Sequence, residues 1–228
     1  MTGPVDPTAR RREFLERRRR TTRENFDRRW ARVYDDDWGS YLNPTHERMV
    51  RRLVGGDRPT RLLDAACGTG KYWPLLLDVG VTVTGVDQSE QMLRRARAKH
   101  PSVPVAVLGL QELACLRTRT FDRVMCVDAI ECVGPEDWPL VVDGLAGATR
   151  PGGTIYLTVE DPDRDGEVEP AVDARDDDPL VAGELLFGTA YHFYPQDSWV
   201  DDRLAERGLR VLLDERGHDY RHLMLRVP

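Results

Sequence analysis

The chain has 228 residues, which suits one domain of ordinary size with appendages and is short for two domains. Hydrophobic residues make up 40% of the chain and charged residues 32%, a balance typical of a globular protein rather than of a disordered or fibrous one. No apolar run approaches the roughly 18 residues that a membrane-spanning helix requires, so the sequence predicts no membrane partner.

The net charge of −6 is unevenly distributed along the chain. Residues 10–34 carry 11 arginines and four acidic residues, a net charge of +7, which leaves −13 for the rest. A basic arm can bind nucleic acid, but an acidic body repels phosphates, which disfavours that partner. The alternative is a helix that docks on the body through apolar residues at three- and four-residue steps, namely Phe26, Trp30, Val33 and Tyr34.

The compartment is predicted from the first residues and from the cysteines. The segment 11–15 begins with the paired arginines of an export signal, but Arg17–Arg20 stand where the apolar stretch of such a signal should follow. The four cysteines show no CxxC spacing and predict neither a zinc site nor a disulfide framework. We therefore expect the chain to remain in the reducing cytoplasm.

Strand-like and helix-like segments alternate through the middle of the chain. A helix is predicted at 45–54, and short apolar runs then predict strands at 61–66, 81–87, 103–108, 121–127 and 154–159. Between the strands, helices are predicted at 71–79, at 89–99 with Ser89 as N-cap, and at 135–146. Strands separated by helix-length segments must cross over to pair in parallel, which predicts an α/β fold with helices on both faces of the sheet.

The remainder of the chain departs from this alternation. Residues 160–178 hold ten acidic residues and two arginines, which predicts a solvated connection. A helix is predicted at 196–207, followed by strands at 210–214 and 222–227. The short turn between these two strands predicts an antiparallel hairpin.

The loop after the first strand predicts a ligand site, because ligands of such sheets bind beyond the carboxyl ends of the strands. Asp64 ends this strand, and Gly68 and Gly70 let the backbone of the following turn approach a ligand closely. A dinucleotide site would have a third glycine three positions after Gly70, where Trp73 stands.

The same loop excludes a phosphate loop, because Tyr72 follows Lys71 where Ser or Thr is needed. These exclusions leave a nucleoside without phosphates as the predicted ligand. Asp87 supports this interpretation, since a carboxylate at the end of the second strand can accept hydrogen bonds from both ribose hydroxyls.

Four ordered motifs resemble those of the class I S-adenosylmethionine-dependent methyltransferases. They are Leu62-Leu63-Asp64-Ala65-Ala66-Cys67-Gly68-Thr69-Gly70, Val83-Thr84-Gly85-Val86-Asp87-Gln88-Ser89, Phe121-Asp122-Arg123-Val124 and Arg150-Pro151-Gly152-Gly153. The resemblance implies a Rossmann-like, seven-stranded, mostly parallel sheet with helices on both faces and an antiparallel C-terminal strand. It also implies a cofactor-binding methyltransferase domain at 51–228, and a basic helical arm at 1–50 that acts as a lid.

The resemblance further implies which residues bind S-adenosyl-L-methionine and its product S-adenosyl-L-homocysteine. Asp64 and the turn with Ala66, Gly68 and Gly70 would hold the methionine portion, and Asp87, followed by Gln88, would hold the ribose. Gln111 and Glu112 would hold the adenine, which Met92 would flank. We expect Tyr34 or Tyr41 of the arm to approach the methionine carboxylate. Each of these residues also has a purely structural alternative, such as capping a turn or filling the core.

Three side chains are candidates for removing a proton from the methyl acceptor. Asp128 and Glu131 follow the fourth strand and share a face if the chain turns helical there, although a hydrogen-bonded connector is the alternative. His192 is the preferred general base, because it lies among aromatic residues that could enclose an acceptor. A histidine side chain also has an ordinary pKa near neutrality, so it can accept a proton there. A core aromatic cluster with one satisfied histidine is the alternative.

The sequence therefore predicts methyl transfer from S-adenosylmethionine to a small molecule, at oxygen or nitrogen and without a metal. One rival is a cofactor-binding fold used for rearrangement or decarboxylation, and another is an RNA- or protein-associated factor that binds through the arginine-rich arm. The identity of the acceptor stays open. So does the oligomeric state, for which a homodimer is one candidate.

Overall fold

The computed structural model describes residues 6–39, 41–56, 60–116, 119–161 and 178–228. Most of the predicted acidic connection, residues 162–177, lies outside this set. Seven strands form one sheet, in the order β3-β2-β1-β4-β5-β9-β8. Their bounds are β1 (Arg61–Ala65), β2 (Thr82–Asp87), β3 (Val105–Val107), β4 (Phe121–Cys126), β5 (Thr149–Glu160), β8 (Arg210–Gly217) and β9 (Tyr220–Arg226).

The first five strands pair in parallel, and β9 is antiparallel to both of its neighbours, β5 and β8. The predicted fold class and the predicted terminal hairpin are thus confirmed. The hairpin turn consists of His218 and Asp219, which both have positive φ, at 49° and 65°. Two such residues form the tight turn whose twist matches that of the flanking strands.

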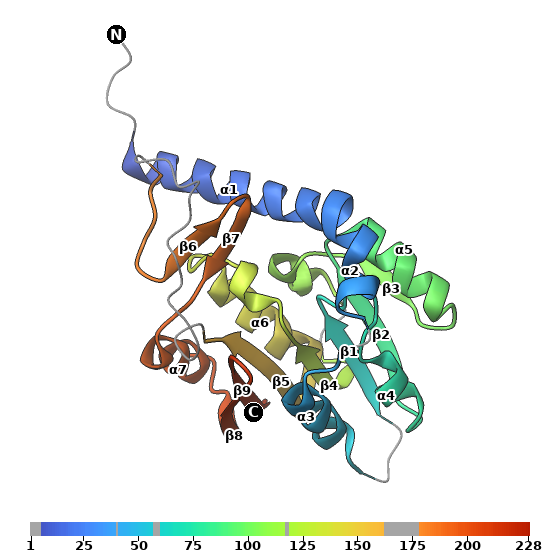
Figure 1. Ribbon diagram of the computed structural model, residues 1–228. Helices are drawn as coiled ribbons and strands as arrows, with labels where there is room; N and C mark the ends of the chain where they lie inside the picture. The colour runs from blue at the N-terminus through green and yellow to red at the C-terminus, as the bar shows by residue number, and fades with distance from the viewer. Residues whose placement is uncertain (1–5, 40, 57–59, 117–118, 162–177) are drawn as a thin grey trace.

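The helices lie on both faces of the sheet, as Figure 1 shows. They are α1 (Pro7–Asn25), α2 (Ala31–Asp37), α3 (Pro44–Val54), α4 (Trp73–Leu77), α5 (Glu90–Lys99), α6 (Trp138–Ala148) and α7 (Asp197–Ala205). A π-helix, η1 (Phe26–Trp30), joins α1 to α2, and two 3₁₀ helices, η2 (Leu110–Cys115) and η3 (Ile130–Cys132), follow β3 and β4. No helix among these described residues is long and apolar enough to cross a membrane.

Side chains that alternate along each strand form two separate hydrophobic cores. Leu62 and Met125 pack with α3, α4 and α5, whereas Leu63 and Val124 pack with η2, α6 and α7. This alternation is the two-residue period of a strand buried on both faces. It fixes the register, so that the carboxyl ends of β1, β2 and β4 meet at one edge of the sheet.

Several element boundaries differ from the predicted ones. The helix predicted at 71–79 is only α4, since residues 69–72 continue the glycine turn. The helix predicted at 135–146 begins later, at Trp138, because residues 134–137 form a turn that ends at its N-cap, Asp137. A second, two-stranded sheet of β6 (Glu184–Phe187) and β7 (Ala190–Phe193) was not predicted.

The arm is helical from Pro7 to Asp37, and α1 passes β7 and leads through η1 to α5 (Figure 1). The prediction of which apolar side chains of the arm are buried against the body was only partly correct. Phe26, Trp30 and Tyr34 are half-buried and Val33 is exposed, while the fully buried apolar side chains are Phe14, Leu15 and Ala31. Arginines flank Phe14 and Leu15 on both sides, which obscures their hydrophobic pattern in the sequence.

Candidate functional site

The turn after β1 has a left-handed backbone at three positions, with φ of 64° at Ala66, 53° at Gly68 and 74° at Gly70. A Cβ atom at Gly70 would lie 2.6 Å from the ring of Trp73, so a side chain has no room there. The Trp73 indole also donates a 2.8 Å hydrogen bond to Oδ2 of Asp64. Trp73 thus occupies the space beside the turn and holds Asp64 beneath it.

Asp87 joins the glycine turn to the start of α5. Its Oδ2 accepts a 2.8 Å hydrogen bond from the backbone N–H of Gly68, and its Oδ1 accepts one of 2.8 Å from that of Ser89. Ser89 in turn caps α5 by accepting from the backbone N–H of Met92, as predicted. Each carboxylate oxygen of Asp87 keeps a lone pair for a ligand hydroxyl.

The carboxyls of Asp64 and Asp87 are both buried, at 4% and 8% exposure. Burial raises the pKa of Asp64 to about 7 and that of Asp87 to about 6, and the charge of Asp87 adds to the rise at Asp64. Burial penalises the charged form of each acid, so both carboxyls are placed where a nearby cation would be favourable.

The other residues predicted to bind the cofactor are dispersed around this turn. Met92 is buried, and its Cε lies 3.3 Å from the position of a Cβ at Gly68, so this side chain borders the turn. Gln88 is half-buried. Gln111 donates to Asp137 at 3.2 Å, whereas the exposed Glu112 accepts a local hydrogen bond from the backbone N–H of Gly109.

Two aspartates of the arm contact the same loops, and sequence reasoning did not single them out. Asp27 accepts from the Ser89 hydroxyl at 2.6 Å, and Asp35 accepts from the Thr69 hydroxyl at 2.7 Å. Lys99 of α5 also donates to Asp35, at 2.8 Å. These partners lie far away in sequence, and no local pattern identifies such contacts.

Of the two arm tyrosines, the structure brings only Tyr34 to the strand ends. Tyr34 is half-buried, and burial together with the charges of Asp128 and Asp87 raises its pKa. Tyr41 is 50% exposed, and its ring lies 5.8 Å from the ammonium of Lys71.

A second group of acids, which we call the carboxylate cluster, consists of Asp128, Glu131 and Glu160. Asp128 lies in the β4–η3 connection, Glu131 lies in η3, and Glu160 ends β5 opposite Tyr220 of β9. Tyr220 donates a short hydrogen bond to Asp128. The charges of Asp128 and Glu160 both raise the pKa of Glu131, which burial raises most. The helical turn on which the predicted shared face depended begins only at Ile130 and does not include Asp128, whose φ is 54°.

His192 of β7 reaches this cluster from the second sheet. Its Nδ1 lies 3.4 Å from a carboxylate oxygen of Glu160 and 2.7 Å from the hydroxyl of Tyr194. Burial raises the pKa of Tyr194 most, and the charge of Glu160 adds to the rise. These contacts place the predicted histidine at the edge of the cluster, already engaged by two neighbours.

The members of the cluster differ in their access to water. Asp128 is exposed although protein surrounds it closely enough to raise its pKa, as expected for a group that lines a concave surface. Glu131 is only 6% exposed, and its Oε2 has no hydrogen-bond partner within the described ranges of the chain. A buried carboxylate oxygen without a partner is costly, so this atom marks a place where a ligand donor would be stabilising.

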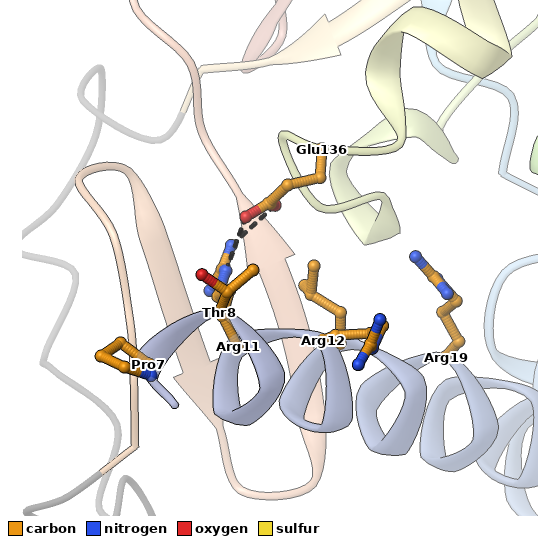
Figure 2. Close-up of a pocket in the computed structure, with 7 residues that line it drawn as sticks. Pro7, Thr8, Arg11, Arg12, Arg19 and Glu136 are labelled. Atoms are coloured by element: carbon orange, nitrogen blue, oxygen red, sulfur yellow. Dashed lines mark hydrogen bonds and ion pairs between the residues drawn. The ribbon is translucent and has the colours of Figure 1, made fainter. Parts of the chain in front are cut away.

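A hollow of about 470 Å³ lies elsewhere, between α1 and the start of α6. Figure 2 shows Arg11, Arg12 and Arg19 projecting from α1, and it shows the ion pair that Arg11 forms with Glu136. Arg11 also pairs with the buried Glu184 at 2.5 Å, and Arg19 pairs with Asp137 at 2.6 Å. These charged groups hold the arm against the body, and the strand ends are the better candidate site.

Comparison with known proteins agrees with this location. Residues 62–153 match the family model described as a methyltransferase domain. The ubiquinone biosynthesis O-methyltransferase of Bordetella avium is 30% identical over 121 residues, which are 51% of this chain and 49% of that protein. The chain therefore spans about half the length of the curated relatives it matches.

Solved structures show the same fold. The Burkholderia thailandensis 1,6-didemethyltoxoflavin-N1-methyltransferase has a TM-score of 0.66 at 16% identity, over 100% of this chain and 93% of that one. The magnesium protoporphyrin IX methyltransferase of Synechocystis has a TM-score of 0.65 at 16% identity, over 100% of both chains. The matched segment contains the glycine turn, Asp87 and the residues that follow β4, so this part of the chain resembles a methyltransferase domain, and the solved structures share its fold.

Proposed function

We propose that this chain transfers a methyl group from S-adenosylmethionine to a small-molecule acceptor, at oxygen or nitrogen, and releases S-adenosylhomocysteine. The observation that carries the proposal is the buried carboxylate of Asp87, which is held against the glycine turn by the backbone of Gly68 and Ser89. A carboxylate fixed in this way can accept both ribose hydroxyls of an adenosyl group. The relatives named above are methyltransferases of small molecules, which supports the same class of reaction.

The charge of the strand ends fits the methyl donor. S-Adenosylmethionine carries a sulfonium cation, and the acids Asp64, Asp87 and Asp128 all have raised pKa values there. A cation bound among buried acids offsets part of the cost of their ionisation. In this proposal Asp64 and the turn at Ala66, Gly68 and Gly70 hold the methionine portion. Met92, Gln88 and Gln111 border the nucleoside.

We assign residues 51–228 to the methyltransferase domain and residues 1–50 to a lid. The hydrogen bonds of Asp27 to Ser89 and of Asp35 to Thr69 support this assignment, because both partners border the proposed cofactor site. Tyr34 lies between them in sequence and completes the closure in this proposal. A lid that excludes water would protect the sulfonium from unproductive attack.

The acceptor would bind beside the carboxylate cluster. In-line displacement at the methyl carbon requires an aligned nucleophile and, where the nucleophile carries a proton, a base within reach. Glu131, Asp128 and His192 are the proposed candidates for that base. Asp128 and Glu131 follow β4 and His192 lies on β7, and the charge of Asp128 acts on both Tyr34 and Lys71.

Calorimetry with S-adenosylmethionine and S-adenosylhomocysteine tests the proposal. We expect both to bind, and we expect Asp87→Ala to lose binding by about 1.5–3 kcal/mol for each charge-assisted hydrogen bond that is removed. Asp143→Ala, an exposed aspartate on α6, is the matched control and should bind like the wild type. Absence of binding by the wild type, or unchanged affinity in Asp87→Ala, would contradict the assignment.

A further inference from the structure

The carboxylate cluster holds one acceptor atom that the described part of the chain leaves unused. Oε2 of Glu131 is buried and has no hydrogen-bond partner among the described residues. Asp128 accepts a hydrogen bond from Tyr220, and Glu160 lies 3.4 Å from Nδ1 of His192. The unpartnered oxygen thus lies among groups that have partners, where an added donor would be stabilising.

Acidic side chains also outnumber basic ones at the cluster. Three carboxylates meet there, while Lys71 and His192 are the cationic side chains whose charge acts on Asp128. Lys71 is itself half-buried, and burial lowers its pKa. A sulfonium would add one positive charge, and a second cation would still be favourable.

We propose that the methyl acceptor is a small amine, which binds at the carboxylate cluster and donates an N–H to Oε2 of Glu131. This inference rests on the proposed function, because it names the acceptor class for the same site. The phenol rings of Tyr34, Tyr194 and Tyr220 border the cluster and supply aromatic surface, which suits an ammonium group better than an anion.

The resident tyrosines indicate why a phenol is the poorer acceptor. Burial and the nearby carboxylates raise the pKa values of Tyr34, Tyr194 and Tyr220. A phenol substrate would meet the same field, so forming its reactive phenolate would be unfavourable. An amine reacts as a neutral nucleophile and gains positive charge during transfer, which the carboxylates stabilise.

In the proposed methyl transfer, these groups account for every bond, proton and electron pair. The bound ammonium gives one proton to the Glu131 carboxylate and leaves a neutral amine. The nitrogen lone pair forms a bond to the methyl carbon while the carbon–sulfur bond breaks, and the sulfur keeps that electron pair as the thioether of S-adenosylhomocysteine. The methylated nitrogen is then an ammonium, whose charge the cluster neutralises.

Binding of matched probes to the full chain tests this proposal. Benzylamine and benzyl alcohol have the same shape, and their affinities for the S-adenosylhomocysteine complex can be compared by calorimetry at pH 7, with methyl transfer followed by mass spectrometry. We expect the amine to bind at least about tenfold more tightly, as for a hydrogen bond to a charged group, and to be the methylated member. Equal responses, including no binding by either probe, or preferential methylation of the alcohol, would overturn the proposal.

Variants of the cluster provide the second measurement. Glu131→Gln should remove most of the preference for the amine while S-adenosylhomocysteine affinity stays unchanged, and Asp143→Asn should keep the preference. If Glu131→Gln does not fold, Glu160→Gln, which is half-buried, should reduce the same preference. A preference that survives in the folded variants overturns the inference alone, whereas a wild type that does not bind S-adenosylhomocysteine overturns the proposed function.

Discussion

In the proposed cofactor site, Asp64 is a buried acid whose ionisation is costly in the free protein. The indole of Trp73 supplies one hydrogen bond to its buried carboxyl. That bond does not offset the loss of water, and the pKa of Asp64 rises from 3.8 to about 7. The charged form is therefore destabilised in the folded state, which is how sites for cations are commonly arranged.

This pKa predicts a pH dependence of stability. The folded state holds the Asp64 proton more tightly than the unfolded state does. The stabilisation that protonated Asp64 adds to the free energy of unfolding is therefore fully present below pH 3.8. It is lost as the pH rises through about 7. We expect Asp64→Asn to flatten the fall in Tm measured by calorimetry between about pH 5 and about pH 8. Asp143→Asn is the control, and equal slopes for Asp64→Asn and wild type would contradict the assignment.

At the scale of elements, the arm is fastened to the loops of the proposed cofactor site by a few polar contacts. Asp27 accepts from the Ser89 hydroxyl and from the backbone N–H of Gln91, at 2.6 and 3.2 Å. Asp35 lies among Thr69, Lys99 and Arg95, and the lysine and arginine contribute to lowering its pKa. Asp27 belongs to η1 and Asp35 to α2. Loss of their hydrogen bonds should therefore loosen η1 and α2 without unfolding the sheet.

The corresponding experiment uses the double variant Asp27→Ala/Asp35→Ala. We expect amide hydrogen exchange in residues 26–37 to become at least about tenfold faster, since hydrogen bonds to charged groups contribute about 1.5–3 kcal/mol each. Dissociation of S-adenosylhomocysteine should accelerate as well. Asp36→Ala, an exposed neighbour in α2, should change neither rate. Faster exchange with unchanged dissociation would indicate that the arm docks on the body but does not cover the cofactor.

At the scale of the whole molecule, the basic arm and the acidic body neutralise each other where they meet. Arg11 joins α1 to β6 through Glu184, whose side chain is fully buried, and to the start of α6 through Glu136. The Tyr191 hydroxyl donates a second, short hydrogen bond to Glu184. Removing one partner of such a buried pair leaves an uncompensated charge, which costs more than the pair itself contributes.

We therefore expect Arg11→Met to lower the free energy of unfolding by about 3–5 kcal/mol in denaturant titrations. Adding Glu184→Gln should restore part of that loss, because the stranded charge is then absent. Arg12→Met, an exposed neighbour on α1, is the matched control and should cost less than about 0.5 kcal/mol. No recovery in the double variant would mean that Arg11 stabilises the arm through packing instead of charge.

Local signals in the sequence predicted the sheet, the Ser89 cap and the glycine turn, because each depends on residues a few positions apart. They did not predict the left-handed backbone of Asp128, whose φ of 54° excludes it from the helical turn that contains Glu131. They missed β6 and β7, although Gly188 and Thr189 between apolar residues are a hairpin signal that could have been used. The contacts of Asp27 and Asp35 could not be predicted from local signals, because their partners are 62 and 34 residues away in the sequence. Only the folded arm makes these residues neighbours.

The position of β9 has a consequence for the order in which the sheet can assemble. This strand follows β8 in the chain, yet it lies between β5 and β8. The edge strand therefore has no sheet partner until residues 220–226 have been synthesised, and the hairpin must add to β5 as a unit. Tyr220 pairs with Glu160, so the proposed acceptor side of the site is completed only when the hairpin has joined β5. We therefore expect a chain without a paired hairpin to retain the proposed nucleoside site and to lack the proposed acceptor site.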